Sequence, residues 1–186
     1  MLFHRVACAA LICLCVAGPA RADDSSWSVL GGYGATHVGM GLTREHVETG
    51  DIVLRYERVL VDDMGASWYK GRHDLLVELP ASFLAADVPP MIAVNFLASY
   101  FFSSFDEYEP YIFLGGGPVY IAADIPGMGS RLNGNYQTGM GVAFKTDKDY
   151  HLIVEYRFHH ISNAGAASPN VPLNSSKLLV GITFLR

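Results

Sequence analysis

Residues 150–158 read YHLIVEYRF, and a large apolar side chain stands at every second position of this stretch. These positions are Tyr150, Leu152, Val154, Tyr156 and Phe158. The positions between them include Glu155 and Arg157. Because successive side chains of a strand point to opposite faces, the stretch predicts a β-strand with one apolar face and one charged face.

Eight runs of strand length follow one another along the chain. They lie at 27–35, 51–60, 73–82, 91–102, 110–121, 135–145, 150–162 and 177–185. Clusters of Gly, Pro, Asp and Asn separate the runs, and long amphipathic-helix patterns are missing from the sequence. Eight strands joined in order can close into a barrel whose interior is filled by side chains. The predicted fold is therefore all-β, an eight-stranded antiparallel barrel.

The alternation fits both a soluble and a membrane barrel, since it does not say which face turns inward. A soluble barrel, such as a lipocalin-like carrier, would bury its apolar face, whereas a membrane barrel turns that face toward lipid. Aromatic residues near the strand ends, glycines suited to a narrow interior and an alternating last strand favour the membrane version. Examples are Trp68-Tyr69, Tyr100-Phe101-Phe102, Gly139 and Gly141. We expect a transmembrane β-barrel of the outer-membrane type.

The first 22 residues have the features of a secretory signal peptide. Arg5 precedes an apolar run of about 15 residues, and Ala20-Arg21-Ala22 is a small-x-small triplet of the kind that signal peptidase cuts after. We expect residues 1–22 to be removed and residues 23–186 to form the barrel. The three cysteines all lie before the cleavage site, at Cys8, Cys13 and Cys15. The mature chain would thus have no disulfide, no thiol nucleophile and no cysteine metal site.

The charge balance of the expected mature chain is acidic. It carries 11 Lys and Arg against 18 Asp and Glu, a net charge of about −7 with neutral histidines. An acidic chain repels the phosphate backbone, which argues against nucleic acid as a partner. After the leader, no apolar run reaches the ~18 residues of a transmembrane helix, which leaves strands as the spanning elements.

The end of the seventh strand carries the residues that point to chemistry. Residues 160–165 read HISNAG, and two positions of one strand separated by one residue share a face. His160 and Ser162 can therefore meet as a general base and a hydroxyl nucleophile. Both continue the apolar even series, so in a membrane barrel they face lipid, where polar groups are costly and suggest function. This geometry favours a lipid substrate.

Other readings of these residues remain open on spacing alone. A strand that ends in His-x-Ser followed by Asn-Ala-Gly is also an ordinary way to leave a sheet. His159 and His160 are adjacent and point to opposite faces, so they are poorly placed to share a metal ion. The sequence suggests no metal and no organic cofactor.

The HISNAG segment, the following Pro169-Asn170 and the last strand resemble the active-site region of the PagL family of lipid A 3-O-deacylases. Further similarity lies in Glu109-Pro110-Tyr111-Ile112 and in Gly139-Met140-Gly141, and the resemblance spans essentially the whole mature chain. It implies an outer-membrane hydrolase that removes the 3-linked acyl chain of lipid A. His160 would be the base and Ser162 the nucleophile. The oxyanion would be stabilised by Asn163, Gly165 and Asn170.

The chain departs from the family pattern at one position. The family places a glutamate 14 residues after the histidine, and Asn174 stands there in this sequence. An asparagine can orient an imidazole through its side-chain oxygen, but it supplies no negative charge to the imidazolium. We therefore expect a working but slower arrangement of His160, Ser162 and Asn174, in which Asn174→Glu preserves or raises activity.

Several functions compete with the lipid A deacylase. A non-enzymatic structural or adhesive barrel would use the HISNAG segment only to start a loop. Another lipid-modifying barrel, such as a phospholipase or an acyltransferase, would share the lipid-facing site. The expected partners are lipopolysaccharide and outer-membrane lipid, and the sequence leaves open whether the protein forms a homodimer.

Overall fold

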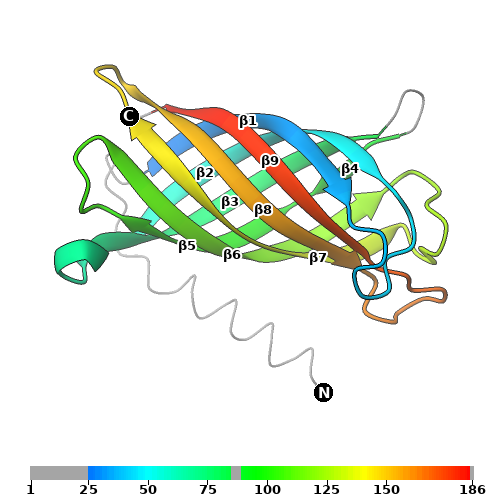
Figure 1. Ribbon diagram of the computed structural model, residues 1–186. Coiled ribbons are helices and arrows are strands. Elements are labelled where there is room, and N and C mark those ends of the chain that lie inside the picture. The colour runs from blue at the N-terminus through cyan, green and yellow to red at the C-terminus, as the bar shows by residue number, and fades with distance from the viewer. Residues whose placement is uncertain (1–24, 85–88, 185–186) are drawn as a thin grey trace.

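A computed structural model of the chain describes residues 25–84 and 89–184 (Figure 1). The expected signal peptide over residues 1–22 lies outside the described residues. The strands are β1 (Ser25–Thr36), β2 (Glu48–Met64), β3 (Gly71–Phe83), β4 (Met91–Ala93), β5 (Asn95–Phe102), β6 (Tyr108–Ile121), β7 (Leu132–Lys145), β8 (Tyr150–Ser162) and β9 (Leu173–Phe184). A 3₁₀ turn at Ser67–Tyr69 lies between β2 and β3.

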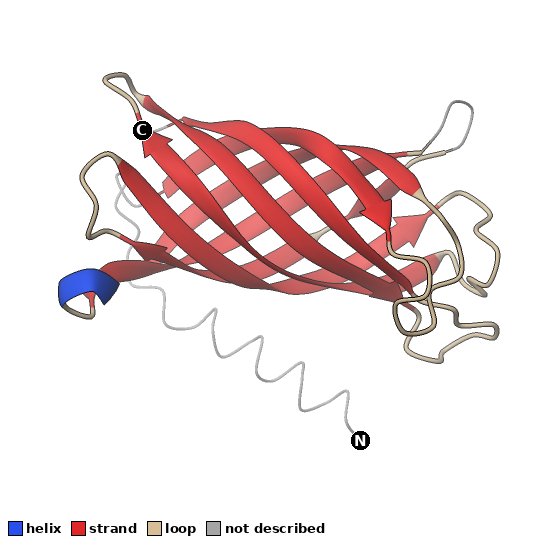
Figure 2. Cartoon of the chain, in the orientation of Figure 1, coloured by secondary structure: helices blue, strands red, loops and turns tan. Residues whose placement is uncertain are grey.

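All neighbouring strands pair antiparallel, and the sheet closes on itself because β1 pairs with both β2 and β9. Beyond these ladders, β2 pairs with β3, and β3 pairs with both β4 and β5. Both β4 and β5 pair with β6, and from there each strand pairs with the next, β6 with β7, β7 with β8 and β8 with β9. Figure 2 shows the tilted strands wrapping around the whole barrel. The expected eight-stranded antiparallel barrel is confirmed, with β4 and β5 together forming the fourth strand.

The fourth strand is interrupted at Val94, where a proline prevents a regular ladder. The N–H of Val94 donates to the carbonyl oxygen of Pro118 over 3.1 Å. Pro118 has no N–H to donate in return, so one of the paired hydrogen bonds is missing. The register of β4 and β5 with β6 nevertheless continues across the gap, from Ala93 opposite Val119 to Phe96 opposite Gly116.

The two faces of the barrel wall have opposite chemistry. Large apolar side chains cover the outside, for example Ile52, Leu114, Leu178 and Val180, each more than half exposed. Charged side chains lie inside, where Arg55, Glu78, Glu155 and Arg157 are buried. A soluble barrel would show the reverse arrangement, so the outward apolar face identifies a membrane barrel. The described residues 25–84 and 89–184 contain no helix long and apolar enough to cross a membrane.

The centre of the interior is an ion-paired cluster. Arg55 and Arg157 each contact both Glu78 and Glu155 at 2.5–2.8 Å. Buried charges are tolerated only when they are paired and hydrogen-bonded, and here two cations meet two anions. The hydroxyl of Tyr111 donates to the same Glu155 carboxylate at 2.5 Å. The cluster ties β2, β3, β6 and β8 together across the barrel.

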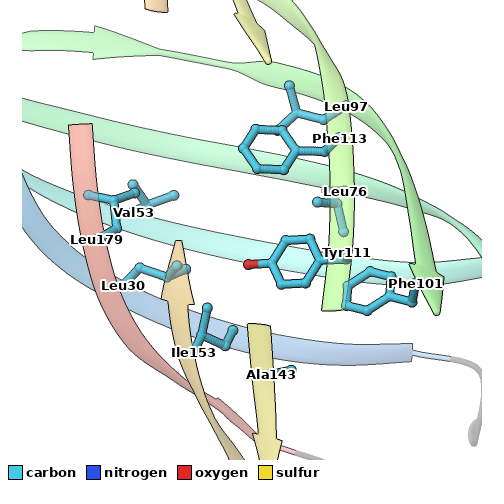
Figure 3. Packing of buried hydrophobic residues seen from close by; sticks show 10 residues of the cluster. All are labelled: Leu30, Val53, Leu76, Leu97, Phe101, Tyr111, Phe113, Ala143, Ile153 and Leu179. Atoms are coloured by element: carbon cyan, nitrogen blue, oxygen red, sulfur yellow. The ribbon is translucent and has the colours of Figure 1, made fainter. Parts of the chain in front are cut away.

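Apolar and aromatic side chains fill the rest of the middle of the barrel (Figure 3). The rings of Tyr111 and Phe101 stack with their centroids 4.5 Å apart. Glycines on β7 make room for this packing, because a Cβ at Gly139 or Gly141 would overlap the ring of Phe113 or Tyr111. The predicted role of these two glycines in a narrow interior is confirmed.

The long connections lie together at one end of the barrel, which we call the loop end (Figure 1). They comprise residues 37–47, 122–131 and 163–172. The opposite end carries short connections such as residues 146–149. Long connections on one side and short turns on the other are typical of outer-membrane barrels.

Candidate active site

His160 and Ser162 lie at the loop end of β8, on the outward face of the wall. His160 Nε2 lies 3.1 Å from Ser162 Oγ. Both side chains are partly exposed, whereas the intervening Ile161 is buried inside the barrel. The alternation of the strand thus brings the imidazole and the hydroxyl together on the face that carries the apolar residues. Their separation is that of a general base and its nucleophile.

Asn174 completes the arrangement from the neighbouring strand. It lies directly opposite His160 in the β8–β9 ladder, and its Oδ1 atom is 2.7 Å from His160 Nδ1. The structure therefore places Asn174, His160 and Ser162 in one hydrogen-bonded series. The nearest acidic residue along β8, Glu155, lies in the interior ion cluster and points away from His160.

The contacts of the Asn174 amide determine how the imidazole is protonated. Its Nδ2 atom donates to the Met40 carbonyl oxygen at 3.1 Å and to Thr43 Oγ1 at 2.9 Å. A carbonyl oxygen can only accept, so the Nδ2 group must face Met40 and Oδ1 must face His160. His160 Nδ1 then carries the proton and donates it to Oδ1. Nε2 is left as the acceptor for the Ser162 hydroxyl, which is the tautomer that a general base needs.

The loop after Ser162 is organised by two of the residues expected to stabilise an oxyanion. Asn163 Nδ2 donates to the Ala167 carbonyl at 3.0 Å, and its Oδ1 accepts the N–H of Gly165 at 2.9 Å. The backbone N–H of Asn163 donates to Asn170 Oδ1 at 3.0 Å. The Asn163 amide and the Gly165 N–H therefore already make hydrogen bonds within the loop. Asn170 can still donate through its Nδ2 group.

The adjacent histidines point to opposite faces of β8, as the alternation predicts. His159 is buried inside the barrel, while His160 faces outward. No group of three or more residues suited to a metal ion occurs among residues 25–84 and 89–184. The ring of His160 lies beside that of Tyr136 on β7, with the two centroids 6.3 Å apart.

Sequence reasoning missed the contribution of residues 37–47 to the site. Thr43 is almost fully buried, and its hydroxyl accepts both the backbone N–H and the side-chain amide of Asn174. His37 Nε2 lies 2.7 Å from Ser176 Oγ, which in turn lies 2.6 Å from the Tyr156 hydroxyl. Ser176 stands two residues after Asn174 and shares its outward face. An outward polar pair at positions 174 and 176 was the available signal, but the expected last strand began only at residue 177.

The interior behind the site is closed. A cluster of buried apolar side chains fills the loop end of the barrel, made of Met91, Ala93, Val119, Ile121, Ala123, Ile125, Ile161 and Leu173. The cavity beneath it, lined among others by Asp51, His159 and Lys177, has a volume of only about 20 Å³, which is room for a single water. A lipid cannot reach Ser162 through the barrel, so the site opens to the outside of the wall.

Solved structures that share this fold include a surface protein and an outer-membrane enzyme. Neisserial surface protein A is 13% identical, with a TM-score of 0.62 over 87% of this chain and 97% of that protein. The outer membrane enzyme PagL is 21% identical, with a TM-score of 0.55 over 84% of this chain and 97% of that protein. Comparison with curated protein sequences gives no significant match. The structural matches confirm a closed eight-stranded antiparallel barrel of the outer-membrane type.

The family comparison is more specific than the shared fold. The family model for lipid A 3-O-deacylase (PagL) matches residues 51–183. This span runs from within β2 to within β9 and contains the hydrogen-bonded series of His160, Ser162 and Asn174. This span is well over half of the chain. The chain therefore belongs to the PagL family of lipid A 3-O-deacylases.

Proposed function

We propose that this protein hydrolyses the ester that holds the 3-hydroxyacyl chain at position 3 of lipid A, using Ser162 as nucleophile and His160 as general base. The observation that supports the proposal is the series Asn174–His160–Ser162 on the outward face of the wall. A member of a lipid A deacylase family with this series in this place has the groups that ester hydrolysis requires.

In the first step the Ser162 oxygen attacks the ester carbonyl carbon. Its proton passes to His160 Nε2, which is the accepting nitrogen in the tautomer assigned above. The carbonyl oxygen becomes an oxyanion, and the Nδ2 group of Asn170 is the side-chain donor we assign to it. When the tetrahedral intermediate collapses, the bond to the sugar oxygen breaks and His160 returns the proton to that oxygen. The acyl chain is then esterified to Ser162.

In the second step water releases the acyl chain. His160 Nε2 takes a proton from a water molecule, whose oxygen attacks the acyl carbon of Ser162. The ester bond to Ser162 breaks, His160 protonates the serine oxygen, and a 3-hydroxy fatty acid leaves. The imidazolium forms in both steps. Asn174 holds its Nδ1–H through its neutral side-chain oxygen, which keeps the ring in place while the charge forms.

The outer leaflet of the outer membrane is the place of the reaction in this proposal. The loop end carries the long connections and the candidate site, and outer-membrane barrels turn their long connections outward. A signal peptide over residues 1–22, removed before Asp23, would export the chain. The acyl chains of lipid A would then lie beside the apolar wall with their ester groups near Ser162.

Mass spectrometry of lipid A from an outer-membrane-containing host tests the proposal. Expression of the protein should remove one 3-hydroxyacyl mass from lipid A. A gain of an acyl chain would indicate an acyltransferase, and lysophospholipid with intact lipid A would indicate a phospholipase. Unchanged lipids with a folded, heat-modifiable barrel would favour a structural protein.

A further inference from the structure

The connection between β1 and β2 lies over the outward face of β9. The N–H of His37 donates to the Asn174 carbonyl oxygen at 2.7 Å, and its imidazole contacts the Ser176 hydroxyl. Thr43 contacts the Asn174 side chain. Both β9 residues lie on the face of the wall that carries Leu178 and Val180, which are exposed apolar side chains. Residues 37–43 therefore lie on the lipid side of the wall.

The other side of this connection is apolar and uncovered. Val38, Met40 and Leu42 are 58%, 45% and 65% exposed. They alternate with Gly39 and Gly41, which have φ values of +88° and +58°. Three large apolar side chains with this exposure on one short loop form an unpartnered patch. The apolar wall reaches the same end of β1 and β9 through Tyr33 and its ladder partner Leu178, both also exposed.

The connection is held in a defined shape. Within it, Gly39 N donates to the Thr43 carbonyl at 2.9 Å, Met40 N to the His37 carbonyl at 3.1 Å and Thr43 N to the Met40 carbonyl at 3.2 Å. Met40 joins the two sides of the loop, because its side chain is exposed while its carbonyl oxygen accepts the Asn174 amide. A displacement of the apolar side would thus move the group that orients His160.

We propose that residues 38–42 form a wall of the acyl-chain site, in which Val38, Met40 and Leu42 contact the acyl chains of the lipid whose ester lies at Ser162. The inference rests on the proposed function and adds a specific substrate contact to it. The side chains exclude water beside the ester and bind the chain, while the backbone of the same residues holds Asn174. One loop, residues 38–42, would therefore both bind the acyl chain and help to orient His160.

A label on the loop tests its position without requiring activity. The barrel has no cysteine after residue 22, so Leu42→Cys introduces a single site for a nitroxide in the exported protein. In proteoliposomes that contain lipopolysaccharide, the label should be accessible to oxygen and protected from a water-soluble nickel reagent. Val180→Cys, on the apolar wall, is the control for a lipid-exposed position, and Asp124→Cys, whose side chain is 95% exposed, is the control for water. A Leu42 label as accessible to nickel as that at Asp124 would overturn the proposal.

A kinetic comparison tests whether the contacted chain belongs to the substrate. The variant Val38→Ser/Leu42→Ser, which leaves Met40 and its contact with Asn174 in place, should raise the KM for lipid A about tenfold and leave kcat within about twofold, since it removes binding without touching the reacting groups. The control Phe83→Ser/Ile92→Ser removes exposed apolar side chains from the same end of β3 and β4 and should leave KM unchanged. An unchanged KM in the loop variant would overturn the assignment to the substrate, even with a lipid-buried label. Failure of the unaltered protein to deacylate lipid A would instead overturn the proposed function, which the label experiment does not depend on.

Discussion

The side-chain oxygen of Asn174 accepts the Nδ1–H of His160 over 2.7 Å, directly across the β8–β9 ladder. The amide nitrogen of the same side chain donates to Met40 and Thr43. Asn174 is thus held on both sides, and its orientation fixes the tautomer of His160. Position 174 therefore carries an amide together with acceptors that match it.

Asn174→Glu should lower activity, which reverses the expectation from the sequence alone. A glutamate has no donor for the Met40 carbonyl oxygen, so two oxygens would face each other in a largely buried place. We expect kcat on lipid A to fall about tenfold or more. Asn174→Gln, which keeps an amide on a longer side chain, is the control for length. Higher activity of Asn174→Glu would show that the amide contacts do not govern the site.

Thr43 is expected to act through Asn174 as a positioning residue. Thr43→Val keeps the shape of the side chain but removes the hydroxyl that accepts two hydrogen bonds from Asn174. The kcat on lipid A should fall about 3–10-fold while KM stays unchanged. Thr43→Ser restores the hydroxyl and should restore kcat. A Ser variant as slow as the Val variant would point to packing of the methyl group instead.

The alternation of residues was sufficient to predict the barrel and which residues share a face, while the aromatic residues near the strand ends and the glycines favoured an outward apolar face. Glu155 and Arg157 were predicted on the face opposite the apolar series, and they lie in the interior ion cluster. His160 and Ser162 continue the apolar series and lie outside. Strand periodicity is a property of the local sequence, so it can be recognised without knowing the tertiary contacts.

The parts that could not be predicted depend on contacts between distant residues. Thr43 and Asn174 are 131 positions apart, and nothing in the local sequence of either indicates the other. The beginning of β9 was missed because Asn174, Ser175 and Ser176 are polar on both faces and so hide the alternation. The hydrogen bonds of Asn163 with Ala167 and Gly165 likewise depend on the folded shape of the loop, which the sequence does not reveal.

The interior ion cluster should dominate the stability of the barrel. Arg157→Met leaves Glu78 and Glu155 with Arg55 as their shared cation, and breaking a buried pair in this way costs about 3–5 kcal/mol. The urea midpoint of unfolding in detergent micelles should fall accordingly. Lys70→Met, which removes an exposed pair with Asp63 at the opposite end from the loops, should change the midpoint little. Equal midpoints for the two variants would contradict a stabilising role of the cluster.

The most direct test of the central claim compares lipid A deacylation by the purified protein and by Ser162→Ala, with both shown to be folded by heat modifiability. Release of 3-hydroxy fatty acid is followed by mass spectrometry. We predict release by the unaltered protein and a loss of about 10³-fold or more in the variant, because the nucleophile is removed while the barrel is kept. Release at an equal rate by Ser162→Ala would contradict the account.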